Sequence, residues 1–170
     1  GWQELTNKVL PVMRAQGYGR IIHNSSVLGF VAMKYRGAYN ASKFAIEGLT
    51  HTLRLELQGS GVHVSLIQPG PIQSNFRENA YQKFVDNICK DTSAHKVKYE
   101  AVEARLAGKG HGNDATFTLP AESIVPKLRH ALESPRPKVR YPVTFPTHLF
   151  RVLNNILPYS ILDRILGAVD

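Results

Sequence analysis

Hydrophobic positions divide the chain into alternating helices and short strands. Apolar side chains recur every three or four residues near the start, which predicts an amphipathic helix over residues 2–16 with Trp2, Leu5, Val9 and Met13 on one face. The same spacing predicts a longer helix over residues 39–58, with Ile46, Leu49, Leu53 and Leu57 on one face. Residues 20–25 and 62–67 are short and rich in β-branched side chains, as is typical of strands buried in a sheet.

The pattern after residue 70 is less regular. Residues 75–107 are predicted to be helical, residues 108–112 to form a mobile glycine-rich loop, residues 121–134 to form another helix and residues 138–143 a short strand. Residues 146–167 are predicted to form one or two apolar helices, with an interruption near Pro158. We count these helices, within residues 143–170, as part of the same domain.

The order strand, long helix, strand over residues 20–67 is a βαβ unit, which joins two parallel strands by a right-handed crossover. The sequence therefore predicts an α/β fold, a three-layer αβα sandwich of Rossmann type around a parallel sheet. Dinucleotide-binding sheets of this type open with a strand, a glycine-rich turn and a helix. No such turn follows a predicted strand here. We therefore expect residues 1–170 to be the C-terminal part of a single domain whose first strands and glycine-rich loop are missing from this chain.

Composition narrows the class of protein. Hydrophobic residues make up 43% and charged residues 20% of the chain, an ordinary balance for a globular domain. The formal net charge of +8 is spread along the chain without a basic run, so we expect no nucleic-acid partner. The single cysteine, Cys89, excludes an internal disulfide and fits a reducing compartment such as the cytoplasm. No signal-peptide pattern is visible, and the longest charge-free stretch of the apolar tail, residues 152–162, is too short to cross a bilayer.

The candidate catalytic and binding residues lie close to the two predicted strands in the sequence. Tyr39 and Lys43 stand four residues apart at the start of the long helix, so their side chains share one face. An ammonium close to a phenol favours the phenolate, which suits the phenol to exchanging a proton with an alcohol or carbonyl oxygen. Ser26 follows one predicted strand and Pro69-Gly70 follows the next, at the sheet edge where parallel sheets bind ligands. The histidines show no ligand spacing, so we expect no metal site.

Three segments together resemble the short-chain dehydrogenase/reductase family. They are residues 19–29 (GRIIHNSSVLG), 37–57 (GAYNASKFAIEGLTHTLRLEL) and 62–74 (VHVSLIQPGPIQS). Residues 127–144 (KLRHALESPRPKVRYPVT) are similar to the C-terminal part of retinol and 17β-hydroxysteroid dehydrogenases. The resemblance covers nearly the whole chain. It implies an oxidoreductase that transfers a hydride between NAD(P)(H) and a carbonyl or alcohol carbon.

For the catalytic residues, the resemblance implies three roles. Ser26 would polarise the substrate oxygen, Tyr39 would exchange a proton with that oxygen, and Lys43 would hold the nicotinamide ribose and favour the phenolate. Ser25 is a rival for Ser26, but the thirteen-residue spacing to Tyr39 favours Ser26. The family's catalytic asparagine would lie before the first residue of this chain.

For the cofactor, the resemblance implies a nicotinamide dinucleotide. Pro69, Gly70 and Ile72 would flank the nicotinamide. Ser74 stands where the family often has threonine, and either hydroxyl can serve the cofactor. The choice between NADP and NAD stays open, with a slight preference for NADP, because the glycine-rich loop would also precede this chain.

The resemblance also suggests partners. The substrate would be a small lipophilic aldehyde, ketone or alcohol, retinoid-like or steroid-like. The apolar helices of residues 143–167 are expected to cover the sheet or a subunit interface, or else to form a lid or a peripheral membrane contact. We expect a homo-oligomer for the full-length protein and no activity for this chain alone. The alternative is an inactive fragment or a non-enzymatic binding module that keeps the fold.

Overall fold

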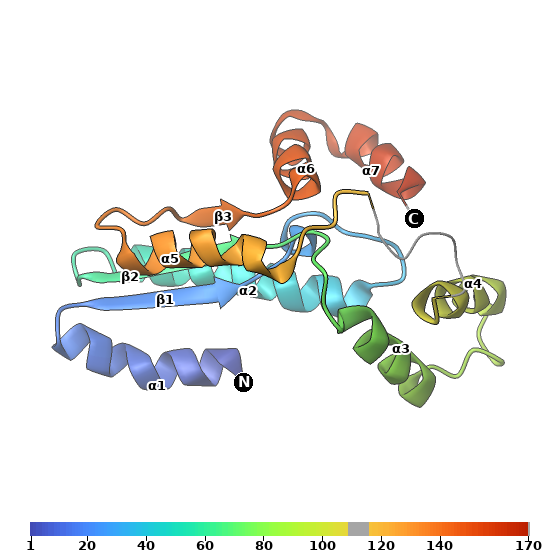
Figure 1. The fold of residues 1–170 in the computed structure, drawn as a ribbon, viewed down its shortest axis with the longest axis horizontal. Coiled ribbons are helices and arrows are strands. Elements are labelled where there is room, and N and C mark those ends of the chain that lie inside the picture. The colour runs from blue at the N-terminus through green and yellow to red at the C-terminus, as the bar shows by residue number, and fades with distance from the viewer. Residues whose placement is uncertain (109–115, 170) are drawn as a thin grey trace.

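The computed structural model describes residues 1–108 and 116–169, and their helices and strands follow the order that the sequence predicts (Figure 1). In chain order the elements are α1 (Trp2–Ala15), β1 (Gly19–Asn24), the 3₁₀ turn η1 (Val27–Gly29), α2 (Gly37–Glu56), β2 (Val62–Gln68), α3 (Phe76–Asn87), α4 (Lys96–Leu106), the 3₁₀ turn η2 (Ala121–Ile124), α5 (Val125–Glu133), β3 (Arg140–Pro142), α6 (Phe145–Ile156) and α7 (Tyr159–Ala168). The predicted loop at residues 108–112 falls almost entirely outside the described residues.

The three strands form one parallel sheet in the order β1-β2-β3. β1 and β2 pair from Gly19 opposite Val62 to Asn24 opposite Ile67. β3 is shorter than the predicted strand and pairs only with the last residues of β2. Because all three strands are parallel, their carboxyl ends lie at one edge of the sheet, and the loops that follow them meet there.

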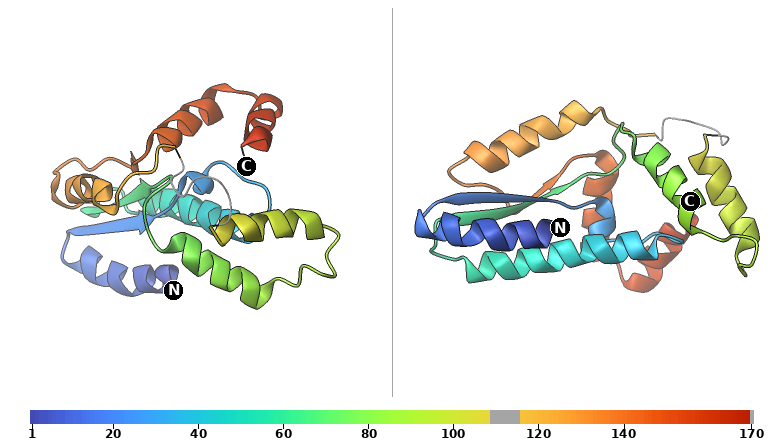
Figure 2. Two further views of the ribbon diagram at one scale, coloured as in Figure 1. Left: turned by 45° about the vertical axis from the view of Figure 1, so that its right-hand side comes forward. Right: turned by 90° about the horizontal axis from the view of Figure 1, so that it is seen from below.

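Helices cover both faces of the sheet and complete three layers (Figure 2). α1 and α2 pack on one face and α5 on the other. Alternating side chains of β1 point to opposite faces, since Ile21 packs in a cluster with Leu53 of α2, whereas Ile22 packs in a cluster with Ala131 of α5. The predicted αβα layering is therefore confirmed.

The apolar face predicted for the first helix is only partly correct. Leu5 is 63% exposed, and the buried residue of α1 is Thr6. Thr6 Oγ1 is hydrogen-bonded to the His23 ring Nε2 at 3.1 Å, and the other ring nitrogen to Thr50 Oγ1 of α2 at 2.7 Å. A buried imidazole thus ties α1, β1 and α2 together, and burial lowers the pKa of His23.

The C-terminal helices close the carboxyl end of the sheet. α6 and α7 pack over η1 in a cluster formed by Leu28, Val31, Phe150, Leu162 and Leu166. The break predicted near Pro158 is present, because this proline precedes the first turn of α7. None of the helices in the described part of the chain is long and apolar enough to span a membrane.

Candidate active site

The loops after β1 and β2 are joined at the carboxyl edge of the sheet. The backbone N–H of Ser25 donates to the Ile67 carbonyl at 2.8 Å, which extends the ladder beyond β1. The next contact joins the two loops themselves, since the Val27 N–H donates to the Pro69 carbonyl at 2.8 Å. The predicted Ser26 loop and the predicted Pro69-Gly70 turn are therefore neighbours.

Ser26 begins the 3₁₀ turn η1. Its Oγ accepts a hydrogen bond from the Leu28 N–H at 3.2 Å, so the side chain caps the turn. Ser26 is buried with only 8% of its surface exposed. Its hydroxyl proton remains available as a donor, because the cap uses the oxygen only as an acceptor.

Ser25 lies differently, although it is adjacent in sequence. Its Oγ donates to Oε1 of Glu47 at 2.5 Å, and the residue is 3% exposed. The hydroxyl of Ser25 is therefore held by a buried carboxylate behind the sheet edge.

The first turns of α2 place Tyr39 and Lys43 beside this edge. Lys43 Nζ lies 5.6 Å from the centroid of the Tyr39 ring, as their four-residue spacing predicts. The same ammonium donates to the backbone carbonyl of Asn24, the last residue of β1, at 2.9 Å. Burial lowers the pKa of Lys43. One N–H of the ammonium is used in this bond, which leaves two for a ligand.

The Tyr39 ring lies in apolar surroundings. It packs against the cluster that joins η1 to α6 and α7, and its ring meets Phe76 of α3 edge-on with centroids 5.7 Å apart. Since Leu28 of η1 belongs to the same cluster, the structure brings the Tyr39 helix and the Ser26 loop together.

The turn after β2 is held tightly from the C-terminal side. A Cβ atom built on Gly70 would lie 2.1 Å from Thr144 Oγ1 and 2.8 Å from Thr147 Oγ1, so the backbone of this turn touches the start of α6. Glycine is needed here for close approach, because any side chain would overlap the two threonines.

Beyond this turn the chain leads into α3. Ile72 is half-buried and pairs with Leu119 in an isolated parallel bridge. Ser74 is exposed, and its Oγ accepts a hydrogen bond from the Phe76 N–H at 3.4 Å at the start of α3. The predicted cofactor residues thus form a half-buried turn followed by an exposed hydroxyl.

The sequence reasoning missed the buried polar groups behind the site. Glu47 of α2 is 6% exposed, and its Oε1 accepts hydrogen bonds from Ser25 Oγ and, at 2.9 Å, from Gln68 Nε2. The available signal is its position four residues after Lys43 and three before the buried Thr50, which places Glu47 on the side of α2 that faces the sheet.

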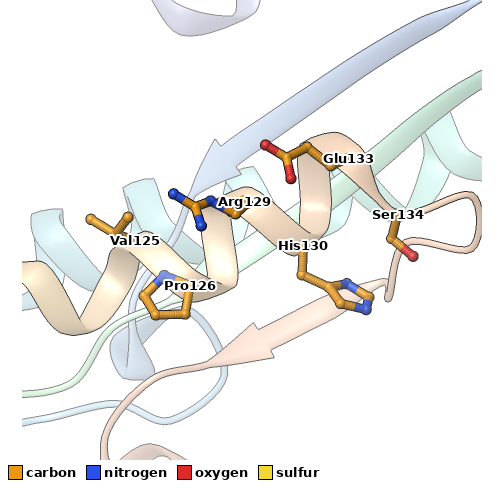
Figure 3. A pocket seen from close by; sticks show the side chains of 6 residues that line it. All are labelled: Val125, Pro126, Arg129, His130, Glu133 and Ser134. Carbon is orange, nitrogen blue, oxygen red and sulfur yellow. The ribbon is translucent and has the colours of Figure 1, made fainter.

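A shallow pocket elsewhere on the molecule contains none of these residues. It runs along α5 and is lined by Val125, Pro126, Arg129, His130, Glu133 and Ser134 (Figure 3). The His130 ring is hydrogen-bonded to the Tyr141 hydroxyl at 2.8 Å, so it is already engaged within the fold. This pocket lies on the α5 layer, away from the carboxyl edge where the candidate residues gather.

Comparison with known proteins places the chain in a family. The family model of the short chain dehydrogenases matches residues 1–102. The chain is 42% identical over 166 residues to the uncharacterized oxidoreductase YbbO of Escherichia coli (strain K12), covering 98% of this chain and 55% of that protein. It is 32% identical over 170 residues to 17-beta-hydroxysteroid dehydrogenase type 6 of Bos taurus, covering 96% of this chain and 52% of that protein.

The fold agrees with that comparison. A short-chain dehydrogenase from Streptomyces avermitilis superposes with a TM-score of 0.63 at 20% identity, covering 99% of this chain and 59% of the other. The chain belongs to the short-chain dehydrogenase/reductase family, a family of oxidoreductases, as its motifs indicate. It spans about half the length of the curated relatives it matches.

Proposed function

We propose that the full-length protein containing this chain is an NAD(P)-dependent oxidoreductase acting on the carbonyl or alcohol carbon of a lipophilic substrate. The observation that carries the proposal is the arrangement of Tyr39 and Lys43 on one face of α2, with the Lys43 ammonium fixed to the end of β1 and the Ser26 loop packed beside them. These groups supply a proton donor, a cation and a hydroxyl at the edge where parallel sheets bind ligands.

In the reducing direction, Tyr39 donates its phenolic proton to the substrate oxygen as the carbonyl carbon receives the hydride. The Lys43 ammonium stabilises the resulting phenolate. Ser26 donates a hydrogen bond to the oxygen while it gains negative charge, which Ser25 cannot do while its hydroxyl is bonded to Glu47. In the oxidising direction the same phenolate takes the proton back.

The residues fit the nicotinamide half of a dinucleotide. When bound, this cofactor supplies or accepts the hydride. The two remaining N–H groups of Lys43 suit the hydroxyls of a ribose, and the half-buried Pro69-Gly70 turn with Ile72 offers an apolar surface to a flat ring. The exposed hydroxyl of Ser74 would bond the cofactor beyond the ring. We propose NADP or NAD as the cofactor.

Apolar surroundings support a lipophilic substrate. Tyr39 is flanked by Phe76 and by the η1, α6 and α7 cluster, so a substrate that reaches its hydroxyl meets aromatic and aliphatic side chains. α6 also exposes an apolar stripe on its outer side, formed by Phe145, Leu149, Val152 and Ile156. We propose that a second subunit or a membrane surface covers this stripe in the full-length protein. Gel filtration and sedimentation with phosphatidylcholine vesicles distinguish the two.

The extent of the domain is also a proposal. β1 pairs only with β2 among the described residues, so its other edge is open to further strands. An open edge, together with relatives of about twice the length, supports a domain whose first strands and glycine-rich loop lie outside this chain. The alternative is a binding module that keeps the same fold without turnover. Such a module would not require Tyr39, Lys43 and Ser26 to lie close together.

The test is turnover by the full-length protein. Oxidation of NADPH and NADH is followed spectrophotometrically with a panel of aliphatic aldehydes, retinoid aldehydes and steroid ketones. We expect turnover with at least one lipophilic carbonyl compound and with one of the two cofactors preferred. Tight binding of dinucleotide without turnover on any member of the panel would favour the binding module.

A further inference from the structure

A buried carboxylate stands behind the candidate active site. Glu47 lies on α2 one turn after Lys43 and is 6% exposed. A carboxylate removed from water destabilises a fold unless hydrogen bonds and opposite charges compensate for the lost hydration. The partners of Glu47 are therefore informative, because each of them is held in place by the need to satisfy this charge.

The two carboxylate oxygens have different partners. Oε1 accepts hydrogen bonds from Ser25 Oγ at 2.5 Å and from Gln68 Nε2 at 2.9 Å. Oε2 faces the Arg140 guanidinium, with Nε at 3.6 Å, and lies 3.9 Å from the ring Nε2 of His51, whose pKa is lowered by burial. The Arg140 guanidinium is also hydrogen-bonded to the His51 ring. One side chain of α2 thus contacts residues at the end of β1, in β2 and in β3.

The residues bonded to Oε1 each stand next to a candidate site residue. Ser25 directly precedes Ser26, and Gln68 directly precedes the Pro69-Gly70 turn. Packing is tight on the Gly29 side of this residue, since a Cβ atom on Gly29 would lie 2.5 Å from Ser25 Oγ and 3.0 Å from Glu47 Cγ. A shift of the Glu47 side chain would disturb its hydrogen bonds to both loops.

We propose that Glu47 is a positioning residue, which holds Ser26 through Ser25 and the nicotinamide turn through Gln68 at fixed distances from Tyr39 and Lys43 on its own helix. The inference rests on the proposed function and adds a residue that acts through others. The two hydrogen bonds of Glu47 position different parts of the site. The bond to Ser25 positions the Ser26 hydroxyl that stabilises the substrate oxygen, and the bond to Gln68 positions the Pro69-Gly70 turn against the cofactor ring.

Single substitutions in the full-length protein distinguish the effects of these two hydrogen bonds. Ser25→Ala removes one donor to Oε1 and should lower kcat at least tenfold while the dissociation constant of NADPH changes less than threefold. Gln68→Met keeps the side-chain length but removes the amide, and should weaken NADPH binding at least fivefold with a smaller loss of kcat. Glu47→Gln replaces Oε1 or Oε2 by an amide donor, which then faces either the two hydrogen-bond donors or the Arg140 guanidinium. Both kcat and the affinity for NADPH should fall. Glu56→Gln, at the exposed end of α2, is the matched control and should change neither.

The measurements are steady-state kinetics and the fluorescence of bound NADPH, each expressed per folded molecule from a urea titration. If Glu47→Gln fails to fold, the Ser25→Ala and Gln68→Met pair still tests the division between kcat and cofactor binding. Reduced stability with unchanged kcat and NADPH affinity in these variants would show that the network only stabilises the fold, and would overturn the proposal. A wild-type protein that binds NADPH without any turnover would contradict the proposed function instead, and the binding of NADPH by Gln68→Met and Glu47→Gln would then decide the role of Glu47.

Discussion

Gly70→Ala tests whether the turn after β2 is as tightly packed as the structure shows. The new methyl group would lie 2.1 Å from Thr144 Oγ1 and 2.8 Å from Thr147 Oγ1. Both threonines are fully buried and lie with their hydroxyl oxygens 3.0 Å apart, so neither can turn away without leaving a buried hydroxyl unpaired. Overpacking of this kind costs about 1–3 kcal/mol. Each kcal/mol corresponds to roughly 2–4 °C in Tm for a domain of this size or larger.

The assay is thermal unfolding of the full-length protein, combined with NADPH titration. Gly70→Ala should lower Tm by several degrees and weaken NADPH binding, because relief of the overlap displaces the turn proposed to face the nicotinamide. Gly48→Ala is the control, since a Cβ atom on Gly48 of α2 meets nothing within 4 Å and alanine favours a helix. Adding Thr144→Ala to Gly70→Ala should recover part of the loss. A Gly70→Ala protein with the Tm and the NADPH affinity of the wild type would refute the packing argument.

Three further results are expected. Lys43→Ala should weaken cofactor binding and move the pH at which alcohol oxidation becomes fast to higher values, because the cation that favours the phenolate is gone; unchanged affinity together with an unchanged pH profile would leave Lys43 without a role. Burial lowers the pKa of His23, so the unfolded chain binds a proton more readily than the folded one. Stability is then fully present above about pH 6.5 and falls as the pH drops toward the folded-state pKa, by at most about 1.4 kcal/mol per pH unit. His23→Gln should therefore weaken the dependence of the unfolding free energy on pH, measured by urea titrations between pH 7.5 and 5. An unaltered dependence would show that His23 is not its source. The isolated chain of residues 1–170 should bind NADH and NADPH at least a hundredfold more weakly than the full-length protein in calorimetry, and micromolar binding by the chain alone would show that we have misplaced the start of the domain.

Regular periodicity made much of the fold predictable. The βαβ unit around Tyr39 follows from strands of short β-branched runs and from a helix with apolar residues every three to four positions. The same reasoning was wrong about Leu5, because the side of α1 that faces the sheet carries Thr6, bonded to His23, together with Leu10 and Met13. Tertiary hydrogen bonds of this kind leave no period in the sequence.

The candidate site was also predictable only in part. Tyr39 and Lys43 were predictable as a pair because four residues on a helix fix their separation. Glu47 was not, since a charged residue on a helix is usually exposed, and its burial depends on Ser25, Gln68 and Arg140 from three other parts of the chain. Residues 75–107 were predicted only to be helical, because their weak patterning hides the break between α3 and α4.

The measurement that tests the central claim most directly is the turnover of Tyr39→Phe in the full-length protein, with the best carbonyl substrate of the panel. Phenylalanine keeps the ring that packs against Phe76 and the η1, α6 and α7 cluster, so the fold and the NADPH affinity should change little. It removes the proton that the substrate oxygen must receive, and loss of such a group costs about 10²–10⁴ in rate. We predict that kcat falls at least a hundredfold while NADPH binding stays within threefold of the wild type. Retention of more than a tenth of the wild-type kcat would show that Tyr39 is not the proton donor.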